Sequence, residues 1–216
     1  MPKIREAAAQ LRQEYLSAPL DCNQLLNDPI EQFHRWFEEA INAEVTEPNA
    51  MSLATSTPDG VPSCRTVLMK DCDDRGFVFF TNYSSRKGQE LEQNPKAALL
   101  FHWRPLHRQV LVRGTVHKVS RDESEEYFHS RPIDSQLGAW ASIQSSVIPS
   151  RAYLEQRFTD LAEEHANQTV PLPEYWGGYC VTPHEIEFWQ GRKNRMHDRI
   201  LYRKTDELWD RDRLSP

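Results

Sequence analysis

The sequence contains no apolar run that approaches the roughly 18 residues needed to span a membrane. Its first residues, Met1 to Glu6, lack the apolar region of a secretory signal. The four cysteines show no C-x-x-C spacing, and the eight histidines form no H-E-x-x-H or H-x-H pattern. We therefore expect a cytoplasmic protein with reduced cysteines, no membrane association and no bound metal.

An excess of basic residues is also absent, because 26 lysines and arginines face 32 aspartates and glutamates, for a net charge of -6. General binding to nucleic acid requires a basic surface that displaces counterions, so we expect no nucleic-acid partner. The basic residues must then act locally. A chain of 216 residues is long enough for one sizeable core and short for two, so we expect a single domain covering residues 1–216.

Residues 1–49 are expected to be an N-terminal helical segment. Asp28 is a suitable N-cap, and Pro29 suits the first helical position. Four apolar residues are spaced to form one face of this helix: Ile30, Phe33, Phe37 and Ile41.

From residue 51 the pattern changes to short β-type runs separated by turn signals. Thr57–Gly60 and Asp73–Gly76 are typical of tight turns, which favour antiparallel pairing. The expected strands are 51–57, 61–70, 77–81, 97–103, 109–119, 177–182, 185–190, 198–203 and 207–210. Helices are expected at 88–93, from Ser120 to His129, at 133–142, and after Ser150. The pattern predicts a mainly β, α+β fold: an antiparallel barrel or sandwich with peripheral helices.

One C-terminal segment carries an unusual concentration of cations. If residues 195–199 form a strand, alternation places Arg195, His197 and Arg199 on one face. Such stacking is unfavourable unless an anion or electron-rich ligand lies opposite. The preceding strand adds Trp189, although a strand tryptophan is most often a core residue. The segment favours a planar, anionic small molecule as ligand.

Other cationic and hydroxyl groups suit phosphate binding. Arg86 and Lys87 open a helix, where a phosphate could bind free N–H groups, although solvated surface cations are an equal interpretation. Arg65 and Lys70 lie at the two ends of one strand and on opposite faces, unless a bulge intervenes or one lies past the strand end. Either cation alone is more simply read as an exposed ion-pair partner.

Three further donors, and two amides, add to this set. Tyr127, Arg131 and Ser135 recur every four residues, but Pro132 interrupts the helix that would align them. The amides of Gln109 and Gln144 suit the edge of a heterocycle, yet each alone is typical of ordinary polar surface.

Together these motifs are more specific than any one of them. Residues 186–190, a four-residue gap and residues 195–199 resemble the signature of the pyridoxine (pyridoxamine) 5′-phosphate oxidase family. The resemblance extends over nearly the whole chain from Leu11. Further motifs appear in family order: 65–70, 85–87, 108–110, 127–132, 135–140, 144–146 and 212–214.

The resemblance implies a split β-barrel homodimer with one FMN per subunit, bound at the subunit interface. The implied FMN-binding residues are Arg65, Thr66, Val67, Leu68, Met69, Lys70, Phe80, Thr81, Arg86, Lys87, Gln109, Gln144, Ser145, Trp189 and Arg199. The implied substrate-binding residues are Lys70, Tyr127, Arg131, Ser135, Arg195 and His197, with Arg12 and Tyr15 from an R-x-E-Y stretch. Gln13 stands where the family often has a second arginine.

The same resemblance implies the chemistry. Pyridoxine 5′-phosphate and pyridoxamine 5′-phosphate would lose a hydride from C4′ to the flavin, giving pyridoxal 5′-phosphate from the alcohol directly or from the amine through a hydrolysed imine with release of ammonia. O2 would reoxidise the flavin and yield H2O2. Arg195 and His197 are the implied catalytic residues, Arg195 orienting the C4′ substituent. Whether either acts as a base stays open.

Two alternatives remain. One is a flavin-binding split-barrel reductase or carrier with another substrate, since the FMN set alone would fit it. The other is a pyridoxal phosphate carrier without flavin. Joint presence of Arg195, His197, Tyr127, Arg131 and Ser135 favours the oxidase over the first, and the full FMN set disfavours the second.

Overall fold

The structure is a computed structural model that describes residues 15, 19–166, 168–206 and 208–216. The described chain divides into two compact units. The first unit comprises the described residues up to 48 together with 100–111 and 185–216. The second comprises 49–99 and 112–184.

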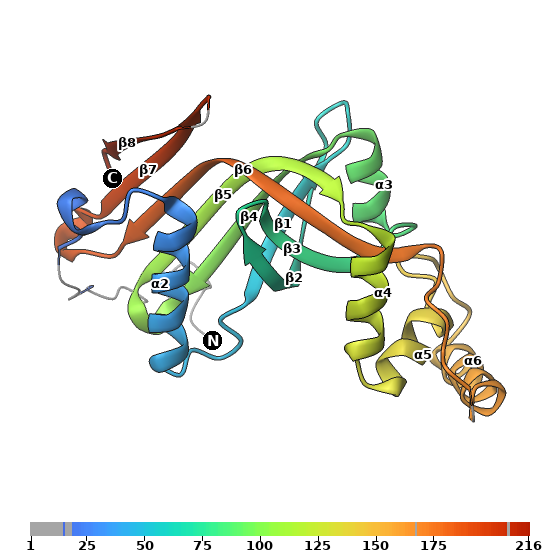
Figure 1. Ribbon diagram of the computed structural model, residues 1–216. Coiled ribbons are helices and arrows are strands. Elements are labelled where there is room, and N and C mark those ends of the chain that lie inside the picture. Colours follow the sequence, from blue (N-terminus) through green and yellow to red (C-terminus); the bar gives the residue numbers. More distant parts are fainter. Residues whose placement is uncertain (1–14, 16–18, 167, 207) are drawn as a thin grey trace, which may run out of the picture. The chain divides into compact units, whose positions relative to one another are not determined.

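The described strands form one sheet in the order β3-β2-β1-β4-β5-β6-β7-β8, and β3 also pairs with β6 (Figure 1). The β3–β6 pairing closes the first six strands of this order into an antiparallel barrel. The strands are β1 Ala50–Ser56, β2 Pro62–Asp73, β3 Gly76–Asn82, β4 Lys96–Trp103, β5 Arg108–Lys118, β6 Trp176–Gln190, β7 Asp198–Thr205 and β8 Leu208–Leu214. The barrel prediction is confirmed. The two strands expected between 177 and 190 are the single strand β6.

The tight turns expected in the second unit join its first three strands. Thr57–Gly60 connects β1 to β2, and Asp73–Gly76 connects β2 to β3. Gly76 has φ +132°, and a Cβ there would lie 2.1 Å from the carbonyl oxygen of Val181. Only glycine meets both conditions without strain. The turn therefore fixes β3 for its antiparallel pairing with β6.

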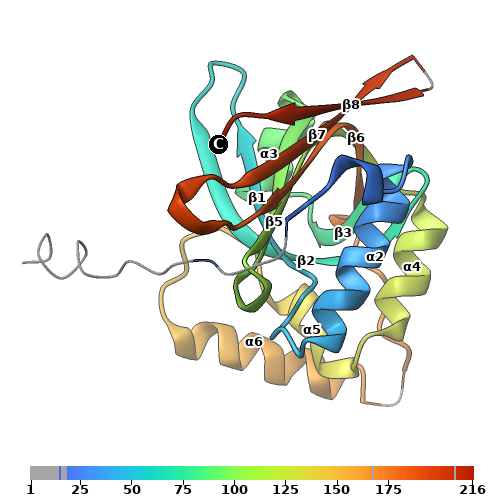
Figure 2. The same cartoon turned by 90° about the vertical axis from the view of Figure 1, so that its left-hand side faces the viewer.

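Serines cap three of the four helices of the second unit, and the sequence indicated two of these caps, Ser120 and Ser150. The helices are α3 Arg86–Gln93, α4 Arg121–Ser130, α5 Ile133–Ala141 and α6 Arg151–Glu164. Ser85, Ser120 and Ser150 each accept a hydrogen bond from a backbone N–H in the first turn of α3, α4 and α6. Helix α5 packs against both α4 and α6 (Figures 1 and 2). Their shared core contains Phe128, Leu137, Val170 and Trp176.

Among its described residues, the first unit contains one long helix, α2 Pro29–Asn42, capped by Asp28 through the N–H of Ile30 at 2.7 Å. The helix is shorter than the segment 1–49 expected to be helical: among the described residues up to 49 only α2 and the 3-10 turn η1 Cys22–Gln24 are helical. Its buried face also differs, because Ile41 is 52% exposed. At 3.6 residues per turn, Trp36 and Ala40 continue the face begun by Ile30 and Phe33.

Aromatic packing holds the first unit together. The rings of Phe33 and Phe101 lie 4.9 Å apart, and those of Trp36 and Phe188 lie 5.1 Å apart. The hydroxyl of Tyr202 in β7 donates to the carbonyl of Leu26 at 2.7 Å, which holds the segment before α2 against the β7–β8 hairpin. No helix within the described ranges is long and apolar enough to cross a membrane.

Candidate active site

A cavity of about 700 Å³ lies in the second unit, a size typical of small-molecule and cofactor sites. Strands β2 and β3 and helices α3, α4 and α5 supply most of its wall. Most residues expected to bind cofactor or substrate from this unit line it: Arg65, Thr66, Val67, Leu68, Lys70, Phe80, Thr81, Lys87, Tyr127, Arg131, Ser135 and Gln144. Three others from the same sets, Met69, Arg86 and Ser145, are not part of its lining.

A β-bulge explains why Arg65 and Lys70 reach the same cavity. In the pairing of β2 with β3, Met69 lies opposite Phe79 and Asp71 opposite Val78, so Lys70 is an extra residue. A bulge interrupts the alternation of side chains along a strand. The two cations, which strict alternation would place on opposite faces, both line the cavity. The sequence pattern allowed this only if a bulge intervened or one cation lay past the strand end, and the structure contains the bulge.

Lys87 is the most buried cation in the cavity wall, with 8% of the residue exposed. Its Nζ donates to neutral oxygens: Thr81 Oγ1 at 3.1 Å, Ser85 Oγ at 3.3 Å and Gln144 Oε1 at 2.6 Å. Burial, with a smaller contribution from the charge of Arg65, lowers the pKa of Lys87 to about 8. A buried ammonium held by neutral groups leaves positive potential directed at the cavity, which an anion would neutralise.

Arg131 is a second cation whose charge is incompletely satisfied. Its Nη2 donates to the carbonyl of Ser135 at 2.7 Å, while its buried Nη1 has no hydrogen-bond partner. Its guanidinium lies 4.8 Å from the ring centroid of Trp176, and burial lowers the pKa of Arg131. A buried donor without a partner costs free energy unless a ligand completes it. A phosphate oxygen would do so.

An aromatic stack lies beside Arg131. The rings of Phe80 and Tyr127 are stacked 4.1 Å apart, and Trp176 stacks on Phe80 at 5.6 Å. The Nζ of Lys70 lies 5.8 Å from the ring centroid of Tyr127. The stack fixes the Tyr127 side chain at the cavity and gives this part of the wall a flat apolar surface.

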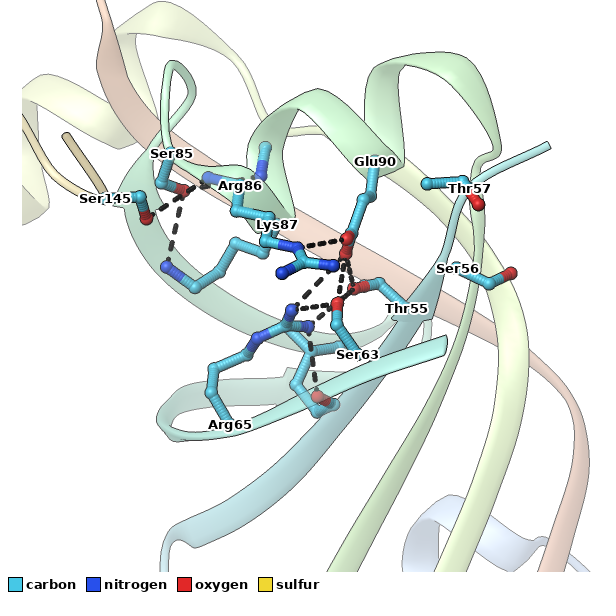
Figure 3. Close-up of polar contacts among 12 residues, drawn as sticks. Thr55, Ser56, Thr57, Ser63, Arg65, Ser85, Arg86, Lys87, Glu90 and Ser145 are labelled. Carbon is cyan, nitrogen blue, oxygen red and sulfur yellow. Dashed lines mark hydrogen bonds and ion pairs between the residues drawn. The ribbon is translucent and has the colours of Figure 1, made fainter. Parts of the chain in front are cut away.

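Arg86, expected at the cofactor phosphate, has its side chain directed at Glu90 (Figure 3). Its Nε donates to Glu90 Oε1 at 3.0 Å, and the side chain is 63% exposed. The backbone N–H of Arg86 donates to Ser145 Oγ at 3.3 Å. Arg86 and Ser145 therefore meet at the start of α3, where the buried Lys87 is the next residue after Arg86.

The first unit holds the remaining candidates. The rings of Trp189 and His197 lie 4.7 Å apart, and Tyr15 lies edge-on to both, at 5.9 Å and 5.7 Å. His197 Nδ1 accepts from the backbone N–H of Arg192 at 3.1 Å, so a neutral ring carries its proton on Nε2. Burial, and then the charge of Arg195, lower the pKa of His197. His197 thus presents an N–H donor at neutral pH.

The expectation that residues 195–199 form a strand is wrong for 195–197, whereas 198 and 199 lie in β7. Lys193–Arg195 is a 3-10 turn, η3, with Asn194 at φ +57° and Arg195 at φ +61°, and β7 begins only at Asp198. A turn is needed here because β6 and β7 are antiparallel neighbours that the chain must connect, and this turn uses two residues in the left-handed region. The sequence pattern led us to expect a ligand that offsets the positive charge of this segment. For Arg199 the Glu187 carboxylate does so, because it accepts hydrogen bonds from Nε and Nη2 at 2.7 Å and 2.9 Å.

Two further candidates are not placed at the cavity by the structure. Gln109 is a half-buried residue of β5 in the first unit and does not line the cavity of the second unit. Arg12 lies outside the described residues.

Comparison with known proteins gives the family. The sequence model "Pyridoxamine 5′-phosphate oxidase" matches residues 37–164, and "Pyridoxine 5′-phosphate oxidase C-terminal dimerisation region" matches 176–216. A pyridoxine/pyridoxamine 5′-phosphate oxidase from Trichormus variabilis is 56% identical over 209 residues, covering 96% of this chain and 98% of the relative. One from Rubrobacter xylanophilus is 55% identical over 217 residues and covers 100% of both chains. The chain belongs to the pyridoxine/pyridoxamine 5′-phosphate oxidase family.

Solved structures agree with this family. PhzG from Burkholderia lata, in complex with tetrahydrophenazine-1-carboxylic acid, has a TM-score of 0.89 at 30% identity and covers 94% of this chain and 100% of its own. A pyridoxamine 5′-phosphate oxidase-related, FMN-binding protein from Nostoc punctiforme has a TM-score of 0.68 at 16% identity, covering 85% and 97%, which shows a shared fold. As a member of the oxidase family, the chain is a flavin oxidoreductase, and its match to the dimerisation region indicates a dimer.

Within the oxidase-family site, sequence reasoning missed two residues. Trp176 lines the cavity and contacts Arg131, but a lone tryptophan at a strand start gave no signal. Glu90 pairs with both Arg65 and Arg86. Its spacing of four from Arg86 on one helix was a usable signal. The roles of individual residues toward cofactor and substrate stay predictions.

Proposed function

We propose that this protein uses FMN to oxidise pyridoxine 5′-phosphate and pyridoxamine 5′-phosphate to pyridoxal 5′-phosphate, with O2 as final acceptor and H2O2 as product. The observation that carries the proposal is one cavity lined by two incompletely neutralised cations, the buried Lys87 and the half-buried Arg131 with its unpartnered Nη1. The reaction brings together two phosphate monoesters, one on the cofactor and one on the vitamin. Identity of about 55% to named oxidases over nearly the full chain supports the same function.

The cofactor phosphate is assigned to Lys87 and Arg65, with Arg86 and Ser145 at the start of α3. Lys87 and Arg65 supply charge at the cavity wall, and a helix start supplies backbone donors suited to a phosphate. The donor chemistry of these residues therefore fits FMN. When bound there, FMN would supply the acceptor for the hydride.

The vitamin phosphate is assigned to Arg131, Tyr127, Ser135 and Lys70. The unpartnered Nη1 of Arg131 and the ammonium of Lys70 near the Tyr127 ring are the supporting observations. A guanidinium offers paired donors that match phosphate oxygens. These residues would orient the substrate so that its C4′ carbon is held at the reacting position.

Arg195, His197, Trp189 and Arg199 are proposed to complete the site of the partner subunit, with FMN at the subunit interface. All four lie in the segment 176–216 that matches a dimerisation region. Arg195 would orient the C4′ substituent, and the Nε2–H of His197 would donate a hydrogen bond to the substrate. A cytoplasmic location, a single domain and the FMN contacts of Gln109 and Met69 remain part of the proposal.

Anaerobic spectroscopy tests the function. The purified protein is expected to show the visible absorption of oxidised flavin, to bleach on anaerobic addition of pyridoxine 5′-phosphate, and to recover in air with release of H2O2. Flavin that stays oxidised with both proposed substrates would favour the alternative of a split-barrel reductase or carrier. A chain that binds pyridoxal 5′-phosphate but takes up no flavin, even from added FMN, would instead indicate a carrier.

Lys87 predicts how cofactor affinity depends on pH. Because its pKa is lowered to about 8, its charge is present below pH 8 and lost above it. The FMN phosphate stays a dianion over that range. The affinity of the flavin-free chain for FMN should therefore fall by about tenfold between pH 7 and pH 9. Fluorescence titration measures this, with riboflavin as the phosphate-free control.

The matched variant for this titration is Lys87→Arg, whose guanidinium stays charged across the range. Its FMN affinity is expected to vary much less between pH 7 and pH 9, whatever its absolute value. The same pH dependence in the variant and the wild type would assign the titration to another group.

A further inference from the structure

Glu90 is a buried carboxylate, with 4% of its side chain exposed, that lies between the guanidiniums of Arg86 and Arg65 (Figure 3). Oε1 accepts from Arg86 Nε at 3.0 Å, and Oε2 accepts from Arg65 Nη2 at 3.3 Å. Oε2 also accepts hydrogen bonds from the hydroxyls of Thr55 and Ser63. One carboxylate thus joins β1, β2 and α3, the last two of which contribute to the cavity wall.

Glu90 is ionised at neutral pH. Burial alone would raise the pKa of its carboxyl, but the hydrogen bonds from Ser63, Thr55, Arg86 and Arg65 outweigh burial and hold the pKa at about 2. A buried charge is costly unless it is paired and fully hydrogen-bonded, and Glu90 meets both conditions. Its negative charge is therefore a permanent part of this region.

The contacts of Arg65 show what this charge does. Besides Glu90, its Nη1 donates to the carbonyl of Leu53 at 3.2 Å and to Thr55 Oγ1 at 2.5 Å. Thr55 and Ser63 face each other across β1 and β2, and both also bond to Glu90. The guanidinium is held from several sides while Arg65 still lines the cavity.

The charges in this cluster also match a phosphate monoester. Arg65, Arg86 and Lys87 against Glu90 leave two net positive charges. A phosphate monoester carries a charge of about −2 at neutral pH. Without the carboxylate, two guanidiniums and a buried ammonium would repel one another, and the guanidiniums would lose their anchor.

We propose that Glu90 is a positioning residue that holds the guanidiniums of Arg65 and Arg86 for the phosphate of the flavin cofactor. The inference rests on the proposed function, in which FMN binds in this cavity. Positioning and simple stabilisation of the fold differ in one measurable respect. Loss of a positioning residue weakens binding of a ligand that carries a phosphate but not of the same ligand without it. Loss of fold stability weakens binding of both.

The test is Glu90→Gln, which removes the charge and keeps the shape of the side chain. The full-length chain, freed of flavin, is titrated with FMN and with riboflavin by fluorescence. The variant should bind FMN about tenfold more weakly than wild type, and riboflavin equally well. Glu92→Gln is the matched control, because Glu92 lies on the same helix, is 67% exposed and pairs with Lys118. It should change neither affinity.

The outcomes separate the inference from the function on which it rests. A wild-type chain that does not prefer FMN to riboflavin would contradict the proposed function. A wild-type preference that Glu90→Gln retains, equal weakening of both ligands, or tighter binding of FMN would each overturn the positioning role alone. If Glu90→Gln does not fold, Glu90→Asp keeps the charge but withdraws it by one methylene, and the same phosphate-selective loss is expected at smaller size.

Discussion

Replacing Arg131 with methionine is expected to lower kcat/KM for pyridoxine 5′-phosphate by about 100-fold or more. The buried Nη1 of Arg131 has no hydrogen-bond partner, and its guanidinium lines the cavity. A phosphate would receive charge-assisted hydrogen bonds there, each worth about 1.5–3 kcal/mol. Affinity for FMN should be retained, because Arg131 is assigned to the other phosphate. Steady-state H2O2 production and flavin titration measure the two effects separately.

The same variant should not lose stability. Burial lowers the pKa of Arg131, which shows that its surroundings disfavour the charge. Exchange of an incompletely paired, half-buried cation for an apolar side chain of similar length is expected to be neutral or stabilising. Arg151→Met is the control, since that side chain is 87% exposed and pairs with Glu155 on α6. A fall in Tm or in FMN affinity that parallels the fall in activity would mean that Arg131 acts through the fold.

The fold was accessible from sequence because local signals agreed with the final structure. Serine caps at Ser120 and Ser150 and turns at 57–60 and 73–76 each depend on residues adjacent in the chain. Alternation could not distinguish barrel from sandwich. The barrel depends on the long-range pairing of β3 with β6, which no local sequence pattern reports. The family resemblance, which implies a split β-barrel, supplied that choice.

The strand expected at 195–199 failed for a physical reason. Residues 195–199 alternate like a strand, but β6 and β7 are neighbours and the chain must turn between them, so tertiary structure overrides the pattern. Arg86 was assigned by its place at a helix start. That assignment stays a prediction, and the structure adds that the Arg86 side chain contacts Glu90, one turn further along α3. The spacing of charges predicted which residues gather, while side-chain direction required the structure.

Arg195→Ala is expected to lower kcat/KM by about 100-fold to 1,000-fold, the usual cost of removing a donor that acts at the reacting atoms. FMN affinity should be nearly unchanged, because the cofactor phosphate is assigned elsewhere. Alanine is preferred to glycine because Arg195 has φ +61°, where glycine would relax the turn and alanine keeps a comparable strain. Lys193→Ala, an exposed cation in the same turn η3, is the control and should retain activity. Bound flavin lost in proportion to rate would contradict the assignment.

Arg195→Ala also tests whether each site is shared between subunits. If Arg131 of one subunit and Arg195 of its partner serve the same site, a mixed dimer of Arg131→Met and Arg195→Ala chains contains one doubly altered site and one intact site. Random reassembly of equal amounts should then restore about a quarter of wild-type sites from two nearly inactive parents. If both residues served a site within one chain, every site in the mixture would carry one substitution and no activity would return. Recovery on mixing therefore distinguishes a site shared between subunits from a site contained within one chain, because only a shared site can be rebuilt from two defective chains.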